Sequence, residues 1–311
     1  MTDINQIKSL FAKRLDETSQ LVQQTNKTSV LVIQQFPIKS DTDTLLPNIR
    51  ESISNILCFV ELGDLNILRE IIQLSAGKVD SIVLDSDIKC PSSRSIIEYA
   101  SSHIKTSKLF FYSDNNTWAD SAIKFLLQIN EGLLDKKIFL SGEGFLHDNL
   151  KRKLEDYCPK LIDEKYNENV DIIIGTMVKK ESIDEDKLSL VSKETKIYDV
   201  GIGNFSKKFI RGAKELGASI YRIDIRAGIS SVVMNILETD YLISNVMGAT
   251  KIKEIEMVAG GILGEEGAII LDDINEPLYV IGVADGKGNI KNDLSKKDFD
   301  NIDFVKRLIN K

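Results

Sequence analysis

Cysteine and histidine are scarce in this chain of 311 residues. Its three cysteines, Cys58, Cys90 and Cys158, are odd in number and widely spaced, which argues against a disulfide framework and fits a reducing cytoplasm. Because there are only two histidines and no closely spaced cysteine pair, we expect no structural zinc site and no other bound metal.

Long apolar stretches and runs of basic charge are also missing. No apolar run approaches the length that crosses a bilayer, and the polar N-terminus lacks the basic-then-apolar order of a signal peptide. A net charge of -7 without a long basic run argues against nucleic-acid or anionic-membrane partners. We therefore expect a cytoplasmic protein that acts on a small-molecule substrate, with a homodimer left open.

The residues that are present are typical of a globular protein, with 42% hydrophobic and 28% charged. The length suits two domains better than one. In the first part of the chain, the spacing predicts a leading helix over 3–24, strands at 29–33, 58–62, 79–84 and 108–112, and further helices over 49–57, 64–76 and 92–104. Such alternation predicts a parallel sheet with helices on its faces.

A connector helix follows the fourth of these strands. Thr117 and Asp120 have capping-box spacing, with Thr117 as the N-cap, and Gly132 suits the end of the helix. The alternation then repeats, with strands at 138–140, 161–162, 170–174, 195–200 and 219–223 and helices over 145–154, 206–216 and 228–244. The last part of the chain predicts a β-hairpin formed by 268–271 and 278–283, then a closing helix over 298–309.

A glycine turn at Gly142 and Gly144 joins the strand at 138–140 to the next helix, as in nucleotide-binding βαβ units. Backbone can approach a pyrophosphate there, beside the amide donors of the helix N-terminus. The third position of the G-x-G-x-x-G pattern is His147, so the fingerprint is incomplete. The same two glycines also suit a plain strand–helix turn.

Other residues at strand ends extend this candidate cofactor site. Glu164 lies about twenty residues after Gly142, the spacing at which an acidic side chain binds ribose hydroxyls and favours NAD over NADP. A solvated loop acid is the alternative. Four further residues would let a dinucleotide lie close to backbone, or would be turn residues only: Gly175, Thr176, Gly201 and Gly203.

The segment Asp114-Asn115-Asn116-Thr117, the connector helix and the strand that reaches Gly142 together resemble the lobe junction of shikimate dehydrogenase-type oxidoreductases. The junction also resembles that of the pyrrolysine-forming dehydrogenase. The resemblance covers roughly residues 80–240. It implies an α/β fold with an N-terminal α/β substrate lobe, which we place at 1–116, followed by a connector helix and Rossmann-type parallel-sheet lobe, which we place at 117–245. It also implies NAD or NADP bound in the cleft between the lobes. The C-terminal hairpin extension with its closing helix (246–311) has no counterpart in that group and is predicted from the residues alone.

The chain departs from the motifs of that group. Trp118-Ala119 follow Asn116-Thr117 where shikimate dehydrogenases carry a catalytic Asp, and Lys89-Cys90-Pro91 replace the order in which their catalytic Lys occurs. Shikimate itself is therefore not expected as the substrate.

Candidate catalytic and substrate-binding residues follow the first-lobe strands and one later strand. Lys89 and Asp114 can form a pair that moves a proton while a hydride moves to nicotinamide, or they are two exposed loop charges. Asn116 can hydrogen-bond the substrate or cap the connector helix. Asp224 and Arg226 can bind an acidic substrate or pair with each other.

These features favour an NAD(P)-dependent oxidoreductase whose substrate is a small polar molecule, such as an amino-acid derivative or a hydroxy acid. One alternative is a Rossmann-like nucleotide-binding scaffold or sensor without redox activity, which the incomplete fingerprint supports. Another is an S-adenosylmethionine-dependent methyltransferase, against which the order of elements at the lobe junction argues.

Overall fold

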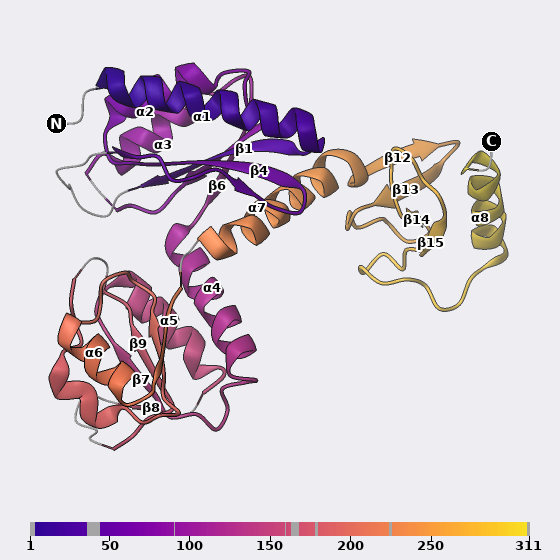
Figure 1. Cartoon of the computed structure of the whole chain (residues 1–311). Coiled ribbons are helices and arrows are strands. Elements are labelled where there is room, and N and C mark those ends of the chain that lie inside the picture. Colours follow the sequence, from indigo (N-terminus) through magenta and orange to yellow (C-terminus); the bar gives the residue numbers. More distant parts are fainter. Residues whose placement is uncertain are drawn as a thin grey trace. The chain divides into compact units, whose positions relative to one another are not determined.

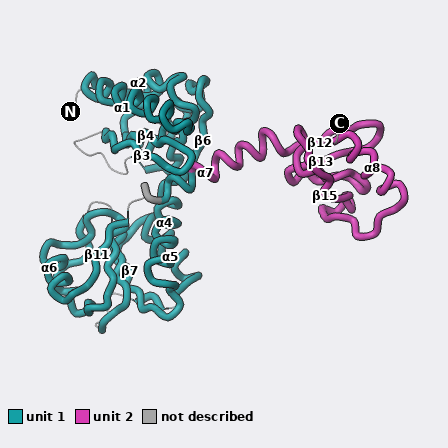
Figure 2. The backbone as a smooth tube through the Cα atoms, turned by 45° about the vertical axis from the view of Figure 1, so that its right-hand side comes forward, with its two compact units in different colours: residues 1–232 teal, residues 233–311 magenta. Residues whose placement is uncertain are grey.

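The computed structural model describes residues 4–35, 44–89, 91–158, 160–162, 168–177, 180–223 and 226–309, without the side chains of 226 and 227. The chain divides into two compact units, residues 1–232 and 233–311 (Figure 2). Within the described part of the chain, no helix has both the length and the apolar character that a bilayer span requires.

Unit 1 begins with an α/β lobe whose central strands are parallel (Figure 1). The strand order is β2-β4-β1-β5-β6, and the short β3 also pairs with β4. The elements are α1 (Ile4–Thr25), β1 (Thr28–Gln35), β2 (Thr44–Leu45), β3 (Arg50–Glu51), β4 (Asn55–Leu62), α2 (Leu65–Ser75), β5 (Ser81–Asp85), α3 (Ser93–His103) and β6 (Lys108–Tyr112).

The three helices of this lobe pack on one face of its sheet. Phe11 and Leu15 of α1 share an apolar core with Leu31 and Ile33 of β1 and with Leu68 of α2. β1 is buried at every position after its first, as is typical of a central strand of a parallel sheet.

The helix predicted over 49–57 is wrong, because this segment turns back on itself and enters β4. The Ser52 amide donates to the Asn55 carbonyl at 2.8 Å, and the Asn55 amide donates to the Ser52 hydroxyl at 3.1 Å. Serine and asparagine satisfy backbone groups locally in this way, and that competes with helix formation. The flanking residues then pair as strands, with Arg50 opposite Leu57.

The connector helix α4 (Asp114–Ile129) begins earlier than the sequence predicts. Its N-cap is Ser113, whose side chain accepts the Asn116 amide, so the capping box predicted at Thr117 and Asp120 is wrong. Thr117 lies in the first turn and donates its hydroxyl to the Ser113 carbonyl at 2.8 Å. Because Ser113 directly follows β6, the helix starts at the carboxyl end of the first sheet.

The second lobe of unit 1 is a parallel sheet with the order β11-β10-β9-β7-β8. Helices α4 and α5 cover one face, while α6 and the 3-10 helix η1 cover the other. The elements are β7 (Ile138–Ser141), α5 (Phe145–Glu155), β8 (Leu161–Ile162), β9 (Ile172–Gly175), η1 (Glu185–Leu190), β10 (Lys196–Asp199), α6 (Lys207–Glu215) and β11 (Ser219–Arg222). The α/β fold with a Rossmann-type parallel-sheet lobe is therefore confirmed.

Unit 2 contains a sheet of the order β12-β13-β14-β15, with α8 packed against it. The predicted hairpin is present as the antiparallel pair β14 and β15, whereas β12 and β13 form a second hairpin that is not predicted from the sequence. The elements from the end of unit 1 onward are α7 (Arg226–Tyr241), the single π-helical turn η2 (Leu242–Val246), β12 (Gly248–Ile252), β13 (Ile255–Ala259), β14 (Ile269–Leu271), β15 (Val280–Val283) and α8 (Lys296–Ile309).

Candidate active site

Each parallel sheet of unit 1 has a point at which the strand order reverses. In the first lobe it lies between β1 and β5, since β4 flanks β1 on the other side. In the second lobe it lies between β7 and β9. Open α/β sheets bind ligands beside the carboxyl ends of the strands at such points.

At the first of these points, Lys89 lies between two buried carboxylates. Its Nζ atom is 2.7 Å from Oδ2 of Asp85, the last residue of β5, and it also forms an ion pair with Asp114 at the start of α4. The Asp85 side chain is fully buried, and only 8% of the Lys89 side chain is exposed. The structure therefore brings together the two predicted catalytic residues and adds a second carboxylate.

Neutral polar groups complete this cluster. The Asp114 Oδ1 atom accepts the Gln34 Nε2 amide at 3.0 Å and the Tyr112 hydroxyl at 3.3 Å. Gln34 is the last residue but one of β1 and is 6% exposed, yet its Oε1 atom has no hydrogen-bond partner among the described residues. A buried acceptor without a donor costs free energy unless a ligand or water supplies one. This atom is therefore available to accept a hydrogen bond from a ligand or from a water molecule.

Burial sets the protonation of the cluster. The pKa of Asp85 is raised to about 6, chiefly because the carboxyl group is buried; Lys89 opposes this rise in part, and the nearby Asp114 adds to it. Burial alone would lower the pKa of Lys89, but its two carboxylate partners outweigh burial and raise it. Burial together with the same carboxylates raises the pKa of Tyr112. Lys89 is thus held as an ammonium, next to a carboxyl group that titrates near neutrality.

Asp87 fixes the start of α4 and thereby the position of Asp114. Its Oδ1 atom accepts the Ser113 hydroxyl and its Oδ2 atom accepts the Asn115 amide, both at 2.8 Å. Negative charge at a helix N-terminus is also favoured by the helix dipole. Neither Asp85 nor Asp87 is among the predicted site residues; the sequence signal that points to them is two carboxylates spaced by one residue where a buried strand ends.

In the second lobe, the glycine turn leaves room at one residue only. A Cβ atom on Gly142 would lie 2.1 Å from Thr176 Oγ1, so Gly142 is required by close packing of the two strand ends. Gly144 has φ +89°, and a Cβ atom there would meet nothing within 4 Å. It is the N-cap of α5 and supplies no side-chain cap, so no N-cap side chain satisfies the first amides of this helix. This geometry suits a phosphate group.

The remaining predicted glycines are accounted for by protein contacts. A Cβ atom on Gly175 would lie 2.4 Å from the Asn204 side chain. A Cβ atom on Gly201 would lie 2.1 Å from the Met177 carbonyl oxygen. The Gly203 amide donates to Asp199 Oδ2 at 2.7 Å. Thr176 donates its hydroxyl to the Ser141 carbonyl at 3.1 Å. These contacts hold the ends of β7, β9 and β10 together beside Gly144.

His147 and Asn116 tie neighbouring elements together. His147 Nδ1 is 3.2 Å from Thr176 Oγ1, and burial lowers its pKa. Asn116 Oδ1 accepts the Asn149 amide of α5 at 2.6 Å, which joins the first turns of α4 and α5. Asn149 lies about one helical turn, or about 5.4 Å, after the N-terminus of α5. Asn116 lies two residues after Asp114. The hydrogen bond between Asn116 and Asn149 therefore joins the helix that carries Asp114 to the helix that follows the glycine turn.

Three predicted site residues have no described side chain. Glu164 and Asp224 lie outside the described residues. Arg226 is the first residue of α7, and its side chain is also outside the described part.

No known protein family and no curated protein matches this sequence. Among solved structures, the fold is similar to that of a shikimate dehydrogenase in complex with NADP+, with 15% identity, a TM-score of 0.36 and coverage of 63% of this chain and 84% of that chain. A chorismate mutase/shikimate 5-dehydrogenase fusion protein from Clostridium acetobutylicum matches with 14% identity, a TM-score of 0.34 and coverage of 63% and 85%. A ligand-free aspartate transcarbamoylase from Trypanosoma cruzi matches with 11% identity, a TM-score of 0.35 and coverage of 70% and 95%. These likenesses concern the fold alone, and they include the dehydrogenase group that the sequence resembles.

Proposed function

We propose that this chain is an NAD(P)-dependent oxidoreductase that interconverts a small polar alcohol and the corresponding carbonyl compound, such as a hydroxy acid or an amino-acid derivative. The observation that carries the proposal is the buried Lys89 ammonium between Asp85 and Asp114, with the unpartnered Gln34 carbonyl beside it. Together they offer a proton and an acceptor at the point where a parallel sheet binds its ligand.

Lys89 is the general acid in this proposal. An ammonium group has three N–H donors, and Asp85 and Asp114 engage two of them. The third can reach a substrate oxygen. As a hydride is added to the carbonyl carbon, Lys89 gives this proton to the oxygen and an alcohol forms. The new hydroxyl group then donates to Gln34 Oε1, and solvent returns a proton to Lys89. The reverse reaction follows the same path.

The residues around Gly144 fit a dinucleotide. The first amides of α5 and the open space at Gly144 would hold the pyrophosphate, with Thr176 beside them. When bound, the nicotinamide would supply or accept the hydride. Glu164 is proposed to meet the ribose and to favour NAD over NADP.

Substrate turnover and binding separate the catalytic proposal from its alternatives. The full chain should reduce NAD+ or NADP+ with at least one member of a panel of hydroxy acids and amino alcohols. The absorbance of the reduced nicotinamide measures this reaction. Lys89→Met should still bind the dinucleotide but lose at least about a hundredfold in turnover, because general acid–base catalysis contributes that much. Unchanged turnover in Lys89→Met would remove Lys89 from the reaction.

A nucleotide-binding protein without redox activity is the second candidate. The observation that favours it is that Trp118-Ala119 follow Asn116-Thr117 where shikimate dehydrogenases carry a catalytic Asp, and that His147 stands at the third glycine position of the fingerprint. Dinucleotide binding without turnover of any substrate in the panel would support this candidate.

A further inference from the structure

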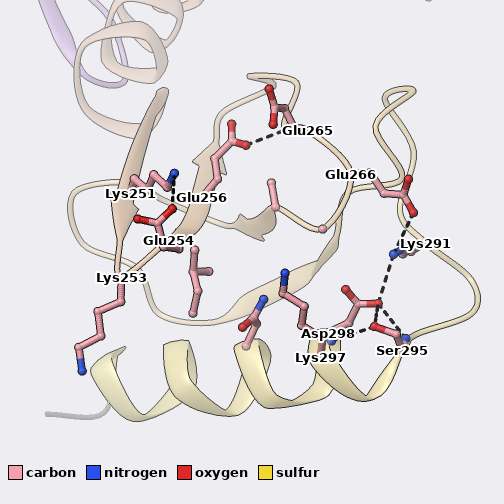
Figure 3. A pocket seen from close by; sticks show the side chains of 14 residues that line it. Lys251, Lys253, Glu254, Glu256, Glu265, Glu266, Lys291, Ser295, Lys297 and Asp298 are labelled. Carbon is pink, nitrogen blue, oxygen red and sulfur yellow. Dashed lines mark hydrogen bonds and ion pairs between the residues drawn. The ribbon is translucent and has the colours of Figure 1, made fainter.

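Unit 2 contains a polar cavity of about 560 Å³ that takes no part in the proposed oxidoreductase site. It lies between the β12–β13 hairpin, the loop that leads into β14, and the first turns of α8 (Figure 3). A volume of this size falls in the range of small-molecule sites.

One wall of the cavity is fixed by an ion-pair network. Lys291 Nζ lies 3.2 Å from both Glu266 and Asp298. Asp298 is 4% exposed and also accepts the Ser295 amide and hydroxyl, both at 2.8 Å. These charges are therefore satisfied within the protein. They hold the start of α8 against the loop and leave the recognition of a ligand to other groups.

Opposite charges remain on two sides of the cavity. The Lys297 side chain points from α8 toward the sheet (Figure 3). In the described part of the chain, neither Lys297 nor the side-chain amide of the neighbouring Asn301 has an ion-pair or hydrogen-bond partner. Across the space, Glu256 accepts only the Glu265 backbone amide, at 3.3 Å, and the Glu265 carboxylate has no described partner. Lys251 is already paired with Glu254 at 3.1 Å.

This distribution excludes several ligand classes. Among the described residues, no three His, Cys, Asp or Glu side chains are arranged to hold a metal ion, so the carboxylates do not form a cation cage. Glu256 and Glu265 would repel a phosphate or another simple anion held by Lys297. A molecule that carries both charges satisfies both sides at once, because each charged group then gains a charge-assisted hydrogen bond.

We propose that this cavity binds a small zwitterion of the free amino-acid class. Its carboxylate lies at Lys297 and Asn301, and its ammonium group lies at Glu256 and Glu265. Ile255 and Ala268 supply the apolar surface for its side chain.

Calorimetric titration of the full chain with each proteinogenic amino acid tests this proposal. At least one should bind saturably, and the same molecule without its amino group or without its carboxylate should not. Lys297→Met and Glu265→Gln should each weaken binding by about tenfold or more, since each removes a hydrogen bond to a charged group. Lys296→Met and Glu276→Gln are matched controls outside the cavity lining and should leave affinity unchanged.

Three results would overturn the proposal. The first is that no amino acid binds. The second is equal binding by the Lys297→Met or Glu265→Gln variant, which would place the ligand elsewhere. The third is equal binding of the deaminated acid, which would make the cavity an anion site. Both variants change exposed side chains, so retained folding is expected and is checked by the unfolding midpoint.

Discussion

At the scale of single residues, Lys89 is the cation of the buried charge cluster in the first lobe. It is the only positive charge described in contact with the two buried carboxylates Asp85 and Asp114. Removing one partner from a buried ionic cluster leaves charge without compensation, which is more costly than losing a surface ion pair.

Lys89→Met should therefore lower the free energy of unfolding at neutral pH by about 3–5 kcal/mol. The loss should be smaller near pH 5, because Lys89 lowers the pKa of Asp85 and without it the carboxyl group is protonated more readily. Denaturant unfolding at both pH values measures this. Lys8→Met is the control, because Lys8 pairs with Glu70 at 2.6 Å on the exposed surface and should cost less than about 1 kcal/mol. Equal losses in the two variants would contradict a buried cluster.

Asp85 predicts a pH dependence of stability. Its pKa is raised from 3.8 to about 6 in the folded protein, so the folded state binds more protons than the unfolded state between these values. The contribution of Asp85 to stability is therefore complete below pH 3.8 and is lost as the pH rises through about 6. The free energy of unfolding should fall by on the order of 2 kcal/mol over this interval, and the fall should be absent in Asp85→Asn. A carboxyl titration near 3.8 by NMR would contradict it.

Glu164 is the residue that we propose sets the preference between NAD and NADP. If its carboxylate meets the ribose hydroxyls, it repels the 2′-phosphate of NADPH. Glu164→Ala should then narrow the preference for NADH over NADPH by about tenfold, and titration of both dinucleotides measures it. Glu168→Ala is the control from the same acidic segment. An unchanged preference in Glu164→Ala would remove this residue from the site.

The sequence predicts part of the first-lobe cluster and not the rest. Lys89 and Asp114 follow neighbouring parallel strands, and such strands end at the same edge of a sheet, so their meeting is predictable. Asp85 is the last residue of a buried strand and Gln34 is the last but one of another, and polar residues at such positions ordinarily mark only the end of a strand. Their burial depends on the start of α4, which Asp87 and Ser113 fix through contacts between residues far apart in sequence.

At the scale of elements, the N-terminus of α5 carries the cofactor proposal. Phe145 is the first residue of this helix and is 61% exposed, so its replacement costs little packing. Phe145→Asp places a negative charge where the pyrophosphate is proposed to bind, and the helix dipole favours an acid there. Phe145→Asn is a matched neutral control.

Phe145→Asp should bind the dinucleotide about tenfold more weakly than Phe145→Asn, with no loss of thermal stability. Fluorescence titration with NADH and NADPH measures the affinities. Equal affinities in the two variants would show that the phosphates do not lie at this helix end.

Helices and strands are predicted correctly where the hydrophobic periodicity extends over a whole element. The prediction fails where short-range hydrogen bonds determine the local structure. The strand at Lys108–Tyr112 matches the prediction at both ends. The sequence does not predict the hairpin of β12 and β13, because its turn, Lys253-Glu254, lacks the glycine or asparagine that ordinarily indicates such a turn. Both residues have positive φ, at 48° and 65°, which the type I′ hairpin turn requires and which these side chains rarely adopt.

At the scale of the whole molecule, the two units have separate apolar cores. The described core residues of the two α/β lobes all lie in residues 1–232, and those around α8 all lie in residues 233–311. Separate cores predict two unfolding transitions, and a ligand raises only the transition of the unit that binds it. The transition of unit 1 is recognised by its larger enthalpy, since enthalpy scales with chain length.

Scanning calorimetry of the full chain, with and without millimolar NADH, NADPH or S-adenosylmethionine, tests the central claim most directly. A dinucleotide at about a hundred times its dissociation constant stabilises the folded state by about 2.7 kcal/mol. The account predicts that NADH or NADPH raises the midpoint of the larger transition and leaves the smaller one in place. No shift with either dinucleotide, or a shift with S-adenosylmethionine alone, would contradict it.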